Sequence, residues 1–170
     1  MRFIIVVCGV AILFMVPAFG FQKDFSPEGA EFSVHMPGTP ECEDLPVTTS
    51  ADQKFVRTCR FFDRKKQVLF QAQYFPTKSV SAGVNPDTVL ALGRDRILMG
   101  ANTQLLSEHK ITVDGRPGIE CVMRAKGEDF SVHMRLILTN RQMAIVGVIG
   151  SERSIRSPGV RSFLDSVRLK

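Results

Sequence analysis

Two cysteines of the sequence have the spacing of a disulfide bond. Segments 42–49 and 54–62 have the composition of strands, and a hairpin between them would turn at residues 50–51. In that register Cys42 and Cys59 lie directly opposite each other, within bridging distance at a non-hydrogen-bonded pair. We therefore predict a Cys42–Cys59 disulfide, which is typical of proteins that fold outside the cytoplasm.

The histidines give a weaker pattern. The pentapeptide Phe-Ser-Val-His-Met occurs twice, at residues 32–36 and 130–134. If both segments are strands, His35 and His133 face outward, and two imidazoles on neighbouring strands could begin a metal site. Such a site needs three or four ligands, and the sequence marks no further ligand at a fixed spacing. Two strands that share one alternation explain the repeat better, because a true repeat should extend further, so we expect no metal and no other cofactor.

The sequence carries no recognisable catalytic motif. It has no Gly-X-Ser-X-Gly elbow, and its Ser-X-X-Lys match at 107–110 falls in a predicted strand, where residues three apart face opposite sides. Cys121 lies in an alternating apolar stretch and is expected to be a buried, inert thiol. We therefore expect a non-catalytic binding or assembly domain. The alternative is an enzyme with a scattered site that uses His109, His133 or Cys121.

The basic residues favour an anionic partner over nucleic acid. The net charge of +5 is a mild excess, compatible with an anionic surface or an acidic protein. The candidate binding residues lie in a predicted hairpin tip and in a serine-rich loop: Arg64, Lys65, Lys66, Lys78, Ser79 and Ser81. A cationic tip of this kind is often only a solvated turn. If these residues bind, the expected partner is an envelope protein or an anionic surface.

The first 20 residues have the pattern of an export signal. Arg2 precedes the apolar run 3–16, Pro17 breaks the run, and small residues stand at positions 18 and 20. We expect residues 1–20 to be a signal peptide and residues 21–170 a single exported domain, periplasmic or secreted. The apolar run is shorter than the roughly 20 residues of a membrane-spanning helix. An uncleaved anchor is the alternative; after cleavage we expect no membrane span.

Periodicity predicts an α+β fold. Residues 130–138 alternate apolar and polar, which indicates a strand with one buried face, and 144–149 are apolar or glycine, as in a strand covered on both faces. We expect this hairpin at the centre of a mostly antiparallel sheet of about eight strands. One helix should begin at Asn85 and a second, closing helix at Ser157, each with a cap-then-proline start. The alternative is a β-barrel with a terminal helix.

Three strings carry a resemblance to a known fold: FSPEGAEFSVHMPGTP at 25–40, DGRPGIE at 114–120 and FLDSVRL at 163–169. Together they resemble small exported bacterial proteins with a PsbP-like α-β-α sandwich. The similarity spans most of the chain after the signal and concerns structural motifs: a strand end, a tight turn and an amphipathic helix. The resemblance implies a protein that binds or assembles, and it carries over no functional residue.

Overall fold

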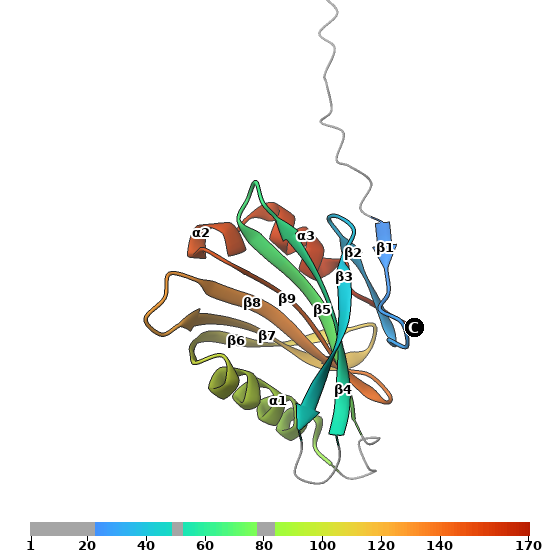
Figure 1. Ribbon diagram of the computed structural model, residues 1–170. Coiled ribbons are helices and arrows are strands. Elements are labelled where there is room, and N and C mark those ends of the chain that lie inside the picture. The colour runs from blue at the N-terminus through green and yellow to red at the C-terminus, as the bar shows by residue number, and fades with distance from the viewer. Residues whose placement is uncertain (1–22, 49–52, 78–83) are drawn as a thin grey trace, which may run out of the picture.

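The computed structural model describes residues 23–48, 53–77 and 84–170 (Figure 1). The strands in this part of the chain are β1 (Lys23–Phe25), β2 (Phe32–Met36), β3 (Glu41–Thr48), β4 (Gln53–Asp63), β5 (Val68–Pro76), β6 (Thr103–Val113), β7 (Arg116–Ala125), β8 (Ser131–Leu138), β9 (Gln142–Gly150) and β10 (Arg168–Leu169). The helices are α1 (Pro86–Gly100), α2 (Glu152–Ile155) and α3 (Pro158–Asp165). The predicted signal peptide of residues 1–20 lies outside the described residues.

Seven strands form one antiparallel sheet with the order β3-β4-β5-β9-β8-β7-β6. The predicted hairpin is β8–β9, and β9 is the fourth of the seven strands. Residues 144–148 of β9 are all buried, as their unbroken apolar run predicted. The α+β class is confirmed.

The molecule has three layers (Figure 1). Helix α1 packs on one face of the seven-stranded sheet, while α2, α3 and a three-stranded sheet, β1-β2-β10, cover the other. The alternative of a β-barrel is wrong. In the described chain β3 and β6 are the two edge strands of the sheet and do not pair with each other, so the sheet does not close. Pro46, which lacks a backbone N–H, lies in the edge strand β3, where its position does not interrupt an inner ladder.

Strand β8 differs from its prediction. Every residue of β8 except Arg135 is buried, so the strand is covered on both faces and not on one. Its polar residues Ser131 and His133 point toward α2 and α3, not to solvent. The prediction failed because a polar side chain in an alternating strand can be buried when it meets a polar partner.

Helix α1 begins as predicted, but only part of its expected apolar side meets the sheet. The Asn85 side chain caps it by accepting a hydrogen bond from the Asp87 N–H at 2.9 Å. The helical spacing of α1 predicts an apolar side formed by Val89, Leu92 and Met99 and flanked by Leu90 and Ile97. Val89, Leu90 and Ile97 do pack against the sheet, but Leu92 and Met99 are 57% and 76% exposed. Gly93 faces the sheet instead, and its missing side chain lets the helix approach Met143, whose sulfur would lie 2.7 Å from a Cβ there.

The C-terminal segment closes the opposite face. Val160, Phe163, Leu164 and Val167 are all at most 1% exposed, which confirms the predicted amphipathic helix α3. After α3 the chain adds β10 to β2, pairing Arg168 with Ser33. The short elements β1, β10 and α2 were not predicted, because two to four residues carry no readable periodicity.

The predicted disulfide forms. Cys42 and Cys59 are register partners on β3 and β4, with Cα atoms 4.1 Å apart.

Cys121 is a buried free thiol, as expected, and burial together with the Glu108 carboxylate raises its pKa to about 12. This thiol therefore stays protonated and unreactive at neutral pH. None of the helices in the described residues is long and apolar enough to span a bilayer.

Candidate functional site

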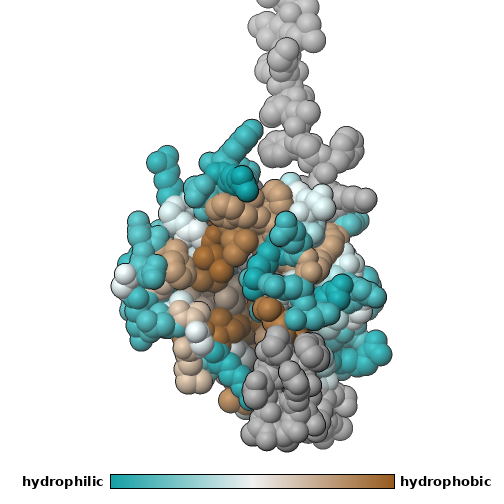
Figure 2. Space-filling model, viewed as in Figure 1, coloured by the Kyte–Doolittle hydropathy of each residue, from teal (hydrophilic) through white to brown (hydrophobic). Residues whose placement is uncertain are grey.

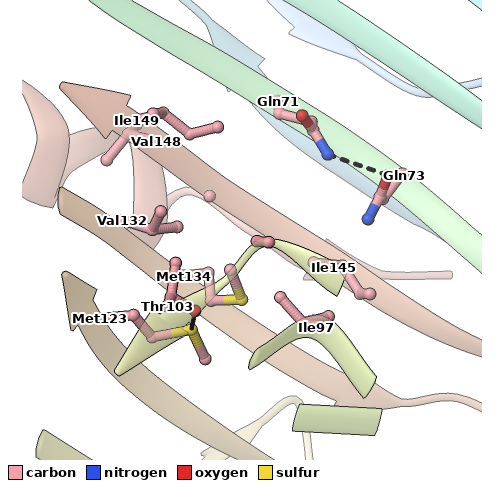
Figure 3. A pocket seen from close by; sticks show the side chains of 12 residues that line it. Gln71, Gln73, Ile97, Thr103, Met123, Val132, Met134, Ile145, Val148 and Ile149 are labelled. Atoms are coloured by element: carbon pink, nitrogen blue, oxygen red, sulfur yellow. Dashed lines mark hydrogen bonds between the residues drawn. The ribbon is translucent and has the colours of Figure 1, made fainter. Parts of the chain in front are cut away.

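The described residues cover one face of the seven-stranded sheet only in part. Helix α1 contacts β6, β7 and β8, and beside it these residues leave part of the face formed by β9 and β5 open. Between the helix and these strands lies an apolar hollow with a volume of about 160 Å³ (Figures 2 and 3). Its lining residues are Gln71, Gln73, Ile97, Ala101, Thr103, Met123, Val132, Met134, Ile145, Gly147, Val148 and Ile149.

A glycine and two methionines shape this apolar hollow. Gly147 of β9 lines it, and a Cβ at this position would lie 2.8 Å from the Met134 Cβ, so no larger residue fits without displacement. Met123 and Met134 lie on the wall beside α1 (Figure 3). The Thr103 hydroxyl is 3.8 Å from the Met123 sulfur and donates to it. Methionine walls are flexible and polarizable, and therefore adapt to apolar groups of different shape.

Two amides from β5 form the polar side of the apolar hollow (Figure 3). The Gln71 Nε2 donates to the Gln73 Oε1 at 2.9 Å, and the Thr58 hydroxyl donates to the same oxygen at 3.2 Å. Within the described part of the chain, the Gln71 Oε1 and the Gln73 Nε2 make no hydrogen bond. One acceptor and one donor therefore remain for a group that enters from outside, which is the pair that a backbone amide requires.

The opposite face holds a buried charge network. The Glu120 carboxylate accepts hydrogen bonds from His133 Nε2 at 2.9 Å, Arg135 Nε at 2.7 Å and Arg161 at 2.9 Å. Arg135 also donates to Asp165 at 2.5 Å and to the Leu164 carbonyl at 2.7 Å, which ties β8 to α3. Burial opposes the ionisation of Glu120, but the bonds from His133 and Arg135 outweigh it and lower the pKa to about 2.

The structure separates the two histidines that were weak candidates for a metal site. His35 lies on β2 of the three-stranded sheet and is paired with Asp24 at 2.5 Å, while His133 is buried on β8 against Glu120. His35 faces outward as expected, with 43% of its side chain exposed, but the expectations that His133 faces outward and that the two strands are neighbours are wrong. In the described residues no three His, Cys, Asp or Glu side chains gather as metal ligands.

The three residues of the alternative enzyme site do not converge either. Cys121 faces α1 among the apolar residues of that layer, whereas His133 lies on the other face of the sheet. Strict alternation along its strand predicts that His109 shares a face with Leu105 and Ile111 and is partly buried. Instead, His109 is exposed on the edge strand β6, where it is the register partner of Glu120. A joint role for these side chains therefore has no geometric support.

The predicted binding residues are divided between a described turn and an undescribed loop. Arg64, Lys65 and Lys66 are exposed at the β4–β5 turn, and Lys66 pairs with Asp63 at 3.2 Å. The serine-rich loop residues Lys78, Ser79 and Ser81 lie outside the described residues.

The apolar hollow was not predicted from the sequence. Its only sequence signal was the pair of glutamines at alternate positions of an otherwise apolar strand, on the face that the core would be expected to fill.

The three-layer arrangement has the PsbP-like fold, as the structural motifs of the sequence indicated. The solution structure of cyanobacterial PsbP from Synechocystis is similar, with a TM-score of 0.61 over 97% of this chain and 98% of that chain, at 9% identity. A protein of unknown function from Pseudomonas aeruginosa aligns over 66% of this chain and 85% of its own, with a TM-score of 0.43 and 9% identity. At such identity the likeness concerns the fold alone. No protein-family model and no curated protein matches the sequence.

Proposed function

We propose that the protein is a non-catalytic, exported binding domain that holds a partner polypeptide by one apolar side chain. The observation that carries the proposal is the apolar hollow, which leaves part of the sheet face open beside α1. Its lining is apolar except for a few polar groups, which is the usual composition of a binding site. Export is supported by the signal-like first 20 residues and by the Cys42–Cys59 disulfide.

The size of the apolar hollow supports a side chain as its occupant. Pockets for drug-sized molecules and cofactors measure roughly 300–1,000 Å³, whereas an engineered cavity of about 150 Å³ holds one benzene molecule. The 160 Å³ of the apolar hollow therefore suits one phenylalanine or leucine side chain. The free acceptor of Gln71 and the free donor of Gln73 suit the peptide group that such a side chain brings with it.

Site-specific photo-crosslinking in cells tests this proposal. A benzophenone amino acid in place of Gln71 would report a protein seated in the apolar hollow, and the same group in place of Leu92 would report the outer side of α1. We expect one defined adduct from position 71 and none from position 92. Ala101→Phe, which adds bulk to the lining, should abolish that adduct, and Ala101→Ser should leave it unchanged.

The crosslinking result would contradict the proposal in two ways. The first is an equal pattern of adducts from positions 71 and 92, which would indicate random encounter. The second is an adduct from position 71 that persists in Ala101→Phe, with circular dichroism showing that the variant is folded. In that case the partner would contact the glutamines without using the apolar hollow.

A further inference from the structure

The basic residues of two separate segments meet at one end of the molecule. The Ser154 hydroxyl of α2 lies 3.5 Å from the Lys66 carbonyl of the β4–β5 turn, and a Cβ on Gly150 would lie 3.2 Å from the Gln67 carbonyl. Helix α2 carries Arg153, which is exposed like the turn residues. We call Arg64, Lys65, Lys66 and Arg153 the basic tip. Figure 2 shows hydrophilic side chains projecting at this end, beyond the apolar surface.

The turn that carries the basic tip is held by its own hydrogen bonds. The Asp63 carboxylate accepts from the backbone N–H groups of Lys65 at 3.0 Å and Lys66 at 3.1 Å. The Gln67 amide donates to the Arg64 carbonyl at 2.7 Å, and Gln67 has a positive φ of 53°. The turn is therefore a defined structure that directs its cations to solvent.

Few acidic groups neutralise the basic tip. Asp63 is paired with Lys66, and Glu152 at the start of α2 is paired with Arg156 at 2.9 Å and with Arg124. In the described part of the chain, Arg64, Lys65 and Arg153 form no ion pair. Three cations are thus left for an external anion, with a fourth, Lys66, beside them.

We propose that the basic tip docks the protein on the surface of an anionic lipid bilayer. Its cations are exposed and converge on no pocket, so they suit a continuous sheet of charge better than one carboxylate of a folded partner. Each Lys or Arg near an anionic bilayer contributes about 1 kcal/mol of attraction, so three or four together hold a protein reversibly. Phe62, which is 48% exposed and precedes Asp63 on the same hairpin, adds an apolar group close to the lipid interface.

Co-sedimentation with vesicles tests this inference. The exported protein is mixed with vesicles of 30% phosphatidylglycerol in phosphatidylcholine, or of phosphatidylcholine alone, at 0.1 M salt. We expect binding only to the anionic vesicles, and its loss at 0.5 M salt. The triple variant Arg64→Gln, Lys65→Gln, Arg153→Gln should bind at least tenfold more weakly. The control Arg96→Gln, Lys110→Gln, Lys126→Gln removes the same charge elsewhere and should bind like the wild type.

Three results would overturn the inference. One is the absence of binding to anionic vesicles, and another is equal weakening by the two triple variants, which would indicate net charge alone. The third is tight binding to soluble polyglutamate by a protein that does not bind vesicles, which would indicate an acidic protein as the partner. None of these results bears on the apolar hollow, whose partner is tested by the crosslinks from position 71.

Discussion

The two faces of the seven-stranded sheet are built from similar apolar strands but are covered very differently. One face is closed by α2, α3 and the three-stranded sheet, and its buried polar groups are joined through Glu120. Among the described residues, α1 is the helix that packs on the other face, and the apolar hollow lies beside it. Together with the proposed function, the difference leads us to propose a division of roles in which the closed face supplies stability and the open face supplies a place to bind.

The largest expected effect tests this division at one aromatic residue. Phe163 of α3 is fully buried and packs edge-on against Phe70, with ring centroids 5.0 Å apart. Phe163→Ala should lower the free energy of unfolding by about 3–5 kcal/mol, as truncations of core aromatics do. Leu92→Ala, on the outer side of α1, should change it by less than about 0.5 kcal/mol. Urea denaturation followed by circular dichroism measures both, and similar losses would refute the division.

The Glu120 network should give the next largest effect. Glu120→Gln leaves Arg135 and His133 without their buried carboxylate and should cost about 3 kcal/mol, as expected when one partner of a buried charge pair is removed. Glu152→Gln is the control, since its partners Arg124 and Arg156 are exposed and such pairs are worth about 0–1 kcal/mol. A Glu120→Gln variant as stable as Glu152→Gln would show that the network does not secure the closed face.

Acid should loosen the closed face. The Thr139 hydroxyl and Arg141 lower the pKa of Glu31 to about 2, against the opposing effect of burial, and Glu120 has the same low value. Because both carboxylates titrate lower in the folded than in the unfolded chain, their stabilisation is complete above pH 4.5 and is lost as pH falls toward 2. Unfolding free energies from pH 7 to 2.5 should therefore decline in this window, and the decline should be smaller in Glu120→Gln. Parallel profiles would contradict this assignment.

The disulfide should contribute a similar amount at the sheet edge. The bond joins residues 17 apart, and in the chain-entropy account a loop of this size contributes about 3 kcal/mol. Cys42→Ser with Cys59→Ser should therefore lower the unfolding free energy without changing the apolar hollow. Cys121→Ser is a poor control, because a serine at this fully buried position would itself lower stability. The reduced wild-type protein is the better comparison for the oxidised one. Equal stability of the oxidised and reduced protein would contradict the prediction.

The smallest effect compares two valines on the two faces. Val146 of β9 is fully buried on the closed face, whereas Val132 of β8 lines the apolar hollow. Truncation to alanine should cost about 1 kcal/mol more at Val146, because a new cavity inside dense packing is costlier than the enlargement of an existing one. Denaturant midpoints of the two variants measure the difference, and a larger loss for Val132→Ala would show that the open face is as tightly packed as the closed one.

Local patterns predicted the elements of this fold well. The register that places Cys42 opposite Cys59 followed from the position of one turn, and the central place of β9 followed from its apolar run. The Asn85 cap followed from the residues at the helix start. Each of these features depends on residues that are close together in the chain, so the local sequence is enough to predict it.

Features that depend on distant partners were not predictable in the same way. His133 was expected to face solvent because its partner Glu120 belongs to another strand, at a register that the sequence does not state. Leu105 and Ile111 were placed on one face, but a β-bulge near Leu106 turns them to opposite faces. The apolar hollow depends on where α1 ends against the sheet. The two glutamines of β5 mark a polar site on that face but do not give the position of the helix.

The proposed binding role of the open face is tested most directly by the methyl signals of methionine. With methyl-labelled protein, titration with N-acetyl-phenylalaninamide should shift Met123 and Met134, which line the apolar hollow, in a saturable way. Met36 in the closed core and Met99 on the outer side of α1 serve as internal references. We predict that these references stay unchanged and that Ala101→Phe abolishes the shifts. Unshifted Met123 and Met134, or equal shifts at Met36 and Met99, would contradict the account.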